Sequence, residues 1–504
     1  MIFWEFAKGR EEALAKAFLE NPAPLLKESG EILKTSGFHR LIWRYENFLV
    51  KEFVFSSFFE RLKWKNKISA PQKEWRALTE LEAEGVSVPP PIALGYKKEG
   101  KQIFVWLISE FVENCVTYDE LRPDYNQEKT EKLARLIAGL HAAFFVHRDL
   151  HAGNLLWQEN TARWFITDFQ HASRGFATRV QLVGDLVQLQ HCLGKKVPLR
   201  LRIIFLREYI RAFAEFTGTL ETHSRTDWHS VFTEVSERVL AYDISQAGAR
   251  SRRALKKNRD FEPYAKGFRA RGESLQLADD LIALFKRPGW ADSTSVSRVR
   301  RGLRSVSAVY DHPHGKTSVF CVEGHLRFWE KFLPFLRRDL RLWKAAARLT
   351  SLHVSCERPV LIQREEDYYF YASLSKAAFT FREAFVMHDA SKRREDLRLL
   401  ARLIGRMHSC GVVHNNLSGE NVWFSEAGQL YLRRLEKVKF YREIPWFGRV
   451  RDLSDLLASA GGNLSYADLR FFLRHYLKAL PERVDLRLLI NDTIYRASLL
   501  EEQK

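Results

Sequence analysis

The second half of this sequence repeats the first at a nearly constant distance, and this repeat limits the folds available to the chain. The segment that begins at His147 returns at His414, and Asp185 returns as Asp452, so both pairs lie 267 residues apart (414 − 147 and 452 − 185). "LREYIRAF" and "LRHYLKAL" keep the same offset. Self-similarity at one fixed offset indicates two copies of one structural unit. We therefore expect two tandem domains, with a boundary after Gly272.

Length and composition agree with two globular domains in a reducing compartment. A chain of 504 residues is long for one hydrophobic core, and its 46% hydrophobic residues suffice for two. The five cysteines form no C-x-x-C pair, so neither a disulfide framework nor a zinc site is expected. The N-terminus lacks the basic-then-apolar order of a signal peptide, and the most apolar stretch, residues 136–146, is too short to span a bilayer. These features predict a cytoplasmic chain without a transmembrane helix.

The net charge of +18 predicts an anionic partner, because a uniformly basic surface repels itself. Basic residues are densest between Arg250 and Gly272. That segment is compatible with a solvated helix and tail, and also with a contact to anionic lipid or a phosphosugar. No zinc-finger spacing, helix-turn-helix pattern or RNA-binding strand accompanies the charge, so we expect no nucleic-acid partner.

Within the first copy, periodicity predicts a strand-rich part followed by a helical part, which is an α+β fold. We expect a helix over residues 11–19 and then strands at "GEILKTS", "HRLIWRY" and "NFLVKEF". A helix from Pro71 to Gly85, the strand "KQIFVWLISEFV" and a long amphipathic helix follow. After the short strand "RWFITDF" the remaining sequence reads as helical.

Charged and amide side chains interrupt a stretch that otherwise reads as core. "VHRDLHAGNLLW" places Asp149 and Asn154 five residues apart, and Asp168 follows fourteen residues after Asn154 at the end of a strand. With the strand lysine Lys51 and the helix glutamate Glu74, this order resembles the protein-kinase-like fold.

The resemblance implies two bilobal domains, residues 1–272 and 273–504, each with a β-rich N-terminal lobe and an α-helical C-terminal lobe. It also implies ATP and Mg²⁺ as cofactors, with Asp149 acting on the acceptor hydroxyl. The other implied site residues are the metal ligands Asn154 and Asp168 and the nucleotide contacts Lys51, Glu74, Ser36, Gly37 and Glu110.

Three residues near this loop have other expected roles. We expect His147 to pack behind the loop and Asp185 to tether the loop backbone through hydrogen bonds. His151 is compatible with contact to the acceptor or a phosphate, and equally with an ordinary surface position.

A closer similarity is to the bacterial lipopolysaccharide kinases, which phosphorylate heptose or Kdo sugars of the lipid A core. It is carried by "EWRALTELEAEGVSVPPPIALG", "HRDLHAGNLLW", "DLVQLQHCL" and the arginine-rich "RSRRALKKNRDF", and covers roughly Lys27 to Phe261. It implies an ATP-dependent phosphotransferase that acts on a sugar hydroxyl of the lipopolysaccharide core, peripheral at the anionic inner-membrane surface. A serine/threonine protein kinase and a non-catalytic, kinase-like binding scaffold stay open as alternatives.

The sequence departs from the kinase pattern in three places. The glycine-rich loop is reduced to Gly37 in "KTSGFHR", and Gln170 stands where the glycine of the D-F-G turn is expected. Only sixteen residues separate Asp168 from Asp185, which leaves no room for a long activation loop. Because such a loop usually forms the docking ledge for a peptide, its absence favours a sugar or another non-peptide acceptor.

The second copy has lost most of the reactive charges. The replacements are Asn416 for Asp149, Arg434 for Asp168 and Leu342 for Glu74. Asn421 survives at the second metal position, and alignment of the turns "YEN" and "VEG" sets Phe328 opposite Lys51, with Lys331 close by. Asparagine cannot accept a proton as a carboxylate can, and arginine repels magnesium. The sequence therefore predicts a pseudokinase from residue 273 onward.

Overall fold

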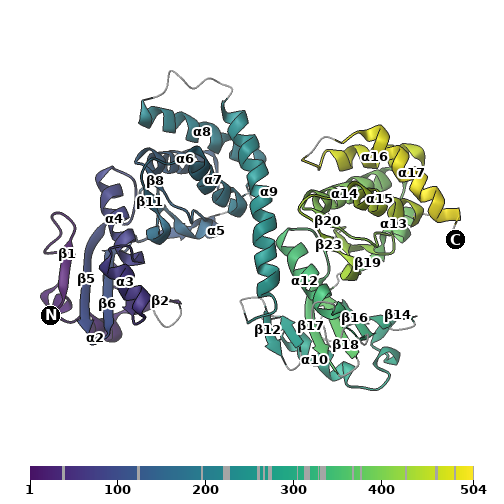
Figure 1. Ribbon diagram of the computed structural model, residues 1–504, viewed down its shortest axis with the longest axis horizontal. Helices are drawn as coiled ribbons and strands as arrows, with labels where there is room; N and C mark the ends of the chain where they lie inside the picture. The colour runs from purple at the N-terminus through teal and green to yellow at the C-terminus, as the bar shows by residue number, and fades with distance from the viewer. Residues whose placement is uncertain are drawn as a thin grey trace. The chain divides into compact units, whose positions relative to one another are not determined.

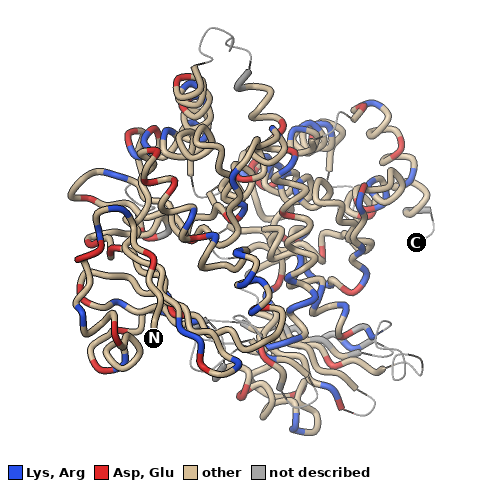
Figure 2. The backbone as a smooth tube through the Cα atoms, turned by 60° about the vertical axis from the view of Figure 1, so that its left-hand side comes forward, with Lys and Arg blue, Asp and Glu red and all other residues tan. Residues whose placement is uncertain are grey.

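The computed structural model divides the chain into two compact units, Met1–Tyr242 and Asp243–Lys504 (Figure 1). No helix among the described residues has the length and apolar character needed to span a membrane. Basic residues are spread over both units (Figure 2). The residues described are 1–36, 40–121, 125–193, 197–218, 227–257, 261–264, 267–270, 275–302, 305–311, 318–326, 329, 337–365, 368–374, 377–425, 428–459, 464–481 and 484–502.

The N-terminal lobe of the first unit is an antiparallel six-stranded sheet with the order β1-β5-β6-β4-β3-β2. Its strands are β1 (Phe3–Phe6), β2 (Glu31–Ser36), β3 (Arg40–Tyr45), β4 (Phe48–Phe55), β5 (Pro91–Glu99) and β6 (Gln102–Glu110). Its helices are α1 (Lys16–Glu20), α2 (Pro22–Ser29), α3 (Phe58–Lys65) and α4 (Ala70–Ala83).

Alternation along β4 decides which side chains meet which helices. Val50 packs in a cluster with Phe18 of α1 and Leu26 of α2, whereas Phe53 packs with Trp75 of α4. Since successive strand residues point to opposite faces, Lys51 lies on the same face as Phe53. The lysine is thereby directed towards α4.

The C-terminal lobe of the first unit is mainly helical. Helix α6 begins at its cap Asn126 and turns an apolar face inward, with Leu133, Ile137 and Leu140 fully buried. This spacing follows the period of an α-helix. The helices are α5 (Tyr118–Leu121), α6 (Gln127–Ala142), α7 (Arg179–Leu193), α8 (Leu199–Thr217) and α9 (Asp227–Arg253), with short turns η2 (Ala152–Asn154) and η3 (Phe169–His171). The strands are β7 (Cys115–Thr117), β8 (Phe145–Val146), β9 (Leu155–Gln158), β10 (Arg163–Ile166) and β11 (Ser173–Arg174).

The second unit repeats this order of elements. Its seven-stranded sheet has the order β12-β13-β17-β18-β16-β15-β14, of which β17-β18-β16-β15-β14 corresponds to β5-β6-β4-β3-β2. The strands are β12 (Phe261–Tyr264), β13 (Gly267–Ala270), β14 (Val296–Gly302), β15 (Ser305–Asp311), β16 (Ser318–His325), β17 (Arg358–Arg364) and β18 (Tyr368–Leu374), followed by β19 (Ala377–Thr380), β20 (Val412–Val413), β21 (Val422–Ser425), β22 (Leu430–Leu432) and β23 (Lys439–Phe440). The helices are α10 (Leu275–Phe285), η6 (Trp290–Asp292), α12 (Arg338–Ser351), α13 (Phe381–Met387), α14 (Ala390–Ser409), η7 (Leu435–Lys437), α15 (Trp446–Ser459), α16 (Tyr466–Leu477) and α17 (Leu486–Glu502).

Strands β12 and β13 come from residues that the sequence places in the basic tail of the first domain. In the structure β13 pairs with β17, where Phe268 lies opposite Ile362. Gly267 makes this approach possible, because a Cβ there would lie 1.9 Å from the carbonyl oxygen of Ile362. The division between the units also falls inside α9, thirty residues before the predicted boundary (272 − 242). Strand β13 takes the place beside β17 that β1 takes beside β5, and only β12 has no counterpart in the first sheet. The repeat could not assign this segment, because β13 takes its place from pairing with β17.

Candidate active site

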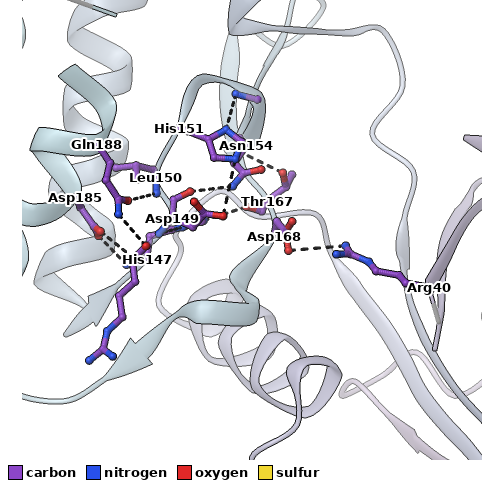
Figure 3. A network of polar contacts seen from close by, with 12 residues as sticks. Arg40, His147, Asp149, Leu150, His151, Asn154, Thr167, Asp168, Asp185 and Gln188 are labelled. Atoms are coloured by element: carbon purple, nitrogen blue, oxygen red, sulfur yellow. Dashed lines mark hydrogen bonds and ion pairs between the residues drawn. The ribbon is translucent and has the colours of Figure 1, made fainter. Parts of the chain in front are cut away.

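The loop between β8 and β9 carries Asp149 and is held by hydrogen bonds to Asp185 of α7 (Figure 3). The Asp185 carboxylate accepts hydrogen bonds from the backbone amides of His147 (2.6 Å) and Arg148 (2.8 Å). Arg148 adopts the left-handed conformation, with φ of 63°. A fully buried carboxylate that accepts two backbone amides fixes the loop in one conformation. The expected tether at Asp185 is confirmed.

Buried aromatic residues complete this support. The two ring nitrogens of His141 lie 3.3 Å from the Asp185 carboxylate and 2.7 Å from the Tyr209 hydroxyl. His147 packs against Phe169, and its Nε2 lies 3.0 Å from the carbonyl oxygen of Thr167. Burial lowers the pKa of His147, which favours the neutral ring. His147 thus packs behind the loop, as the sequence predicts.

Asp149 and Asn154 are tied together by the loop itself. The side-chain amide nitrogen of Asn154 donates to the backbone carbonyl of Asp149 (2.9 Å), which leaves the amide oxygen as a possible cation ligand. The Asp149 side chain is 46% exposed, with Nε2 of His151 at 3.9 Å. His151 accepts a hydrogen bond from the Gly153 amide through Nδ1 (3.0 Å), so a neutral ring carries its proton on the nitrogen nearer to Asp149.

Asp168 lies beside this loop, after β10. The Thr167 amide donates to the carbonyl of Asn154 (3.0 Å), which joins the two predicted metal ligands through the backbone. Asp168 has φ of 66°, a left-handed conformation that few residues other than glycine adopt without strain. The structure therefore brings together Asp149, Asn154 and Asp168.

Lys51 and Glu74 form the ion pair that the sequence predicts, with 2.5 Å between Lys51 Nζ and Glu74 Oε1. Glu74 lies on α4 and is 1% exposed, and Lys51 is 8% exposed. The second oxygen of Glu74 is buried without a hydrogen-bond partner in the described part of the chain. Removal of either charge would leave the other one buried alone.

The other predicted nucleotide contacts are not joined to this group. Glu110 ends β6, and its half-exposed carboxylate pairs with Arg10 (3.1 Å). Ser36 ends β2, where it pairs with Arg40 across the hairpin. Gly37 lies outside the described residues.

Arg40 is a member of the site that sequence reasoning did not identify. It is the first residue of β3, and its Nη2 lies 3.8 Å from Asp168 Oδ1 (Figure 3). The guanidinium also lies over the ring of Phe53, with 5.6 Å to the centroid. The only sequence signal was a basic residue at the start of the expected strand "HRLIWRY". Gln188 of α7, which bonds Leu150 N and Arg148 O, was missed as well.

The donor set agrees with a magnesium–nucleotide complex. Magnesium prefers oxygen ligands, and in kinase sites one or two protein ligands are completed by phosphates and water. Asn154 and Asp168 offer such oxygens side by side. Within the described residues no group of three or more His, Cys, Asp or Glu side chains could hold a metal by itself.

The second unit keeps the support and loses the reactive groups. Asp452 accepts from the backbone amides of His414 (2.6 Å) and Asn415 (2.8 Å), and His408 links it to Tyr476. The Asn421 amide donates to the backbone carbonyl of Asn416 (2.8 Å), and Arg434 takes the left-handed conformation of Asp168, with φ of 56°.

Strand pairing corrects the position equivalent to Lys51. Lys51 lies opposite Leu107 of β6, and Val322 lies opposite Tyr371 of β18. Leu107 and Tyr371 are equivalent, because each lies two residues before the serine at which the pairing of its strand with β5 or β17 shifts register. Val322–Gly324, the segment "VEG" that the sequence alignment treated as a turn, lies inside β16. Phe328 is therefore not the counterpart of Lys51. Phe328 and Lys331 lie outside the described residues. Val322 and Leu342 are both buried and apolar. The ion pair is thus replaced by two hydrophobic side chains.

A buried polar cluster lies next to Arg434. Glu357 accepts a hydrogen bond from Ser373 (3.0 Å), and Arg433 Nε lies 3.7 Å from its carboxylate. Burial raises the pKa of Glu357 to about 7, although Arg433 opposes this shift. A raised pKa means that the folded unit binds this proton more tightly than the unfolded chain.

Glu357 should therefore make stability depend on pH. Its contribution is full below about pH 4.5, the ordinary value, and is lost as the pH rises through about 7. We expect Glu357→Gln to melt at least about 3 °C above the wild-type protein at pH 8, and much closer to it at pH 5. Thermal unfolding at both values measures this. Equal pH dependence in the two proteins would contradict the assignment.

Comparison with known proteins gives a family match in this part of the chain. Residues 57–231 match the family described as "Lipopolysaccharide kinase (Kdo/WaaP) family", a segment that lies in the first unit and contains Asp149, Asn154 and Asp168. No curated protein matches the chain.

Among solved structures, the bifunctional kinase-methyltransferase WbdD is 14% identical over 42% of this chain and 50% of its own, with a TM-score of 0.30. An aminoglycoside-3'-phosphotransferase of type VIII is 14% identical over 46% of this chain and 99% of its own, with a TM-score of 0.31. The chain thus covers about half the length of WbdD. These sequence identities and TM-scores are too low to indicate a shared function. The family match covers residues 57–231, which is 175 of the 504 residues (231 − 57 + 1) and lies within the first unit.

Proposed function

We propose that the protein is an ATP- and Mg²⁺-dependent phosphotransferase that phosphorylates a sugar hydroxyl of the lipopolysaccharide core, heptose or Kdo. The observation that carries this proposal is the family match over residues 57–231, which includes the loop that joins Asp149, Asn154 and Asp168. The acceptor is linked to lipid A, so the proposed location is the cytoplasmic face of the inner membrane, with peripheral attachment.

Each residue of the site has a task in this reaction. Asp149, half exposed on a rigid loop, would accept the proton of the acceptor hydroxyl. Asn154 and Asp168 would hold Mg²⁺, and Lys51, oriented by Glu74, would hold the α- and β-phosphates. Bound ATP supplies the phosphoryl group, and Mg²⁺ neutralises the charge that develops during its transfer.

The short connection after Asp168 favours a sugar over a peptide. Only η3 and β11 lie between Asp168 and the start of α7 at Arg179. A protein kinase uses a longer segment here to bind its substrate. Incubation with γ-labelled ATP and a cell-envelope fraction, followed by separation of lipid from protein, tests this choice. Label in the lipid fraction is expected, and label confined to protein would support the alternative of a protein kinase.

For the second unit we propose a folded but silent kinase-like domain. The supporting observations are the hydrogen bonds of Asp452 and the replacements Asn416 and Arg434. Its function would be as a scaffold, a regulator or an acceptor-binding surface.

Arg40 should contribute to ATP use, because its guanidinium lies 3.8 Å from Asp168, where a glycine-rich loop would otherwise bind phosphates. We expect Arg40→Ala to raise the KM for ATP by about tenfold or more, and to weaken ATP binding more than ADP binding if the contact is to the γ-phosphate. Steady-state kinetics and nucleotide titrations measure both effects. Arg44→Ala is the matched control on the same strand, since Arg44 pairs with Glu113. Equal losses in the two variants would remove Arg40 from the site.

A further inference from the structure

A cavity on the N-terminal lobe of the first unit carries a strong excess of positive charge. It has a volume of about 760 Å³ and is lined by parts of β1, α3, α4, β5 and β6. None of its lining residues belongs to the predicted active site. Its cationic side chains are Arg61, Lys65, Lys67, Arg76, Lys98 and Lys101, against the single carboxylate of Glu5.

These charges are not neutralised inside the protein. Within the described part of the chain none of the six cations forms an ion pair, and Glu5 is engaged by the indole nitrogen of Trp75 (2.8 Å). The Nε of Arg61 is buried without a hydrogen-bond partner in that same part of the chain. Arg76 donates to the backbone carbonyl of Lys67 (2.6 Å), which fixes its guanidinium at the edge of the cavity. Such a cluster is suited to a phosphate group.

Aromatic side chains line part of the cavity. Trp64 and Tyr96 lie 5.2 Å apart between ring centroids, and Phe3 stacks on Tyr96 at 5.3 Å. Aromatic rings beside cations favour a ligand that has an apolar or sugar-like part next to its phosphate. A free inorganic anion would contact the cations but not the aromatic rings.

Helix α3 next to the cavity presents an exposed apolar face. It begins at Ser57, which forms a capping box with Glu60, and buries Trp64. On the side away from Trp64, Phe58 is 65% exposed and Phe59 73% exposed, with Leu62 beside them at 42%. Lys63 and Lys65 flank this face, so apolar side chains lie between two basic borders. This pattern is typical of a helix that lies in a membrane interface.

We propose that this lobe binds an anionic lipid: the cavity takes the phosphate headgroup, and Phe58, Phe59 and Leu62 enter the surrounding membrane. The lipid surface is preferred to an acidic protein because a continuous bilayer offers the phosphate and the apolar phase together. This contact would be separate from the basic segment after Arg250, and phosphotransfer itself does not require it. It rests on the proposed function only for the reason that the acceptor lies in a membrane.

Vesicle sedimentation with the full chain tests the proposal. The probes are vesicles of phosphatidylcholine alone and with phosphatidylglycerol, at low and moderate salt. We expect Lys65→Glu with Lys98→Glu to weaken binding to the anionic vesicles by roughly tenfold or more. Phe58→Ser with Phe59→Ser should weaken binding at both salt concentrations, because apolar insertion is not screened. The matched control is Lys8→Glu with Lys27→Glu, which makes the same charge change at exposed sites of the same lobe.

Each outcome of the vesicle experiment supports or contradicts the proposed lipid contact. If the cavity variant binds as the control does, or if only Arg252→Glu with Arg253→Glu lowers binding, the proposal is overturned. Unchanged binding of the phenylalanine variant, with displacement of the protein by glycerol 3-phosphate, would identify a site for a small anion instead. Binding of an acidic protein but not of vesicles would also overturn it.

Melting temperatures confirm that each variant is folded. If Lys65→Glu with Lys98→Glu is not folded, Lys65→Gln with Lys98→Gln is used in its place. Transfer of label from ATP to detergent-solubilised acceptor is measured in parallel and should not change. Failure of that transfer in the wild-type protein would refute the proposed function and leave the vesicle comparison intact.

Discussion

Replacing Asp149 by Asn is expected to lower turnover by about a hundredfold to ten-thousandfold while ATP affinity stays close to that of the wild-type protein. The carboxylate would act on the acceptor hydroxyl and not on the nucleotide. The loop should keep its shape, because its hydrogen bonds to Asp185 and Asn154 use backbone atoms of the loop. Initial rates with labelled ATP and a nucleotide titration measure the two quantities.

The second unit offers a reciprocal control, since it already has Asn416 at this position. Asn416→Asp should restore no transfer to a chain that carries Asp149→Asn, because Arg434 and Val322 remain. Turnover of Asp149→Asn within a few-fold of the wild-type rate would exclude Asp149 from the reaction.

Replacing Lys51 by Val should abolish productive ATP use and also destabilise the first unit. Glu74 would then be a buried carboxylate without its cation, a change that typically costs about 3–5 kcal/mol. We expect a large fall in melting temperature together with loss of transfer.

The second unit suggests how the loss of stability can be separated from the loss of activity. It has Val322 and Leu342 at these positions, both buried. We therefore expect Lys51→Val with Glu74→Leu to recover most of the lost stability and none of the activity. Thermal unfolding and transfer assays on the single and double variants test this. Activity in the double variant, or no recovery of stability, would contradict the role given to the pair.

The sequence predicted the elements whose signals are local and strong. The helix from Pro71 to Gly85 appears as α4, and "FLVKEF" lies within β4. The loop at Asp149 and its tether Asp185 were also predicted, because the spacing of the motif residues along the chain indicates which of them share one loop. The roles of these residues in catalysis stay predictions.

Other features depend on contacts between distant segments. The helix expected over residues 11–19 begins only at Lys16, and β1 was missed, because its four residues gain their strand from pairing with β5. Arg40 lies 128 residues from Asp168 (168 − 40), so nothing local marks the pair. Strand β13 likewise takes its place from β17.

The hydrogen-bonded support of the loop is the same in both units, with 2.6 Å from Asp185 to His147 N and from Asp452 to His414 N, although only the first unit retains the reactive side chains. The residues that shape the loop are therefore distinct from those that would react. Changes at Asp452 should lower the amount of protein that accumulates in a cell, whereas changes at Asn416 should not. Selection for abundance and selection for chemistry thus act on different side chains, and a duplicated copy can lose its chemistry while it remains a well-folded part of the chain.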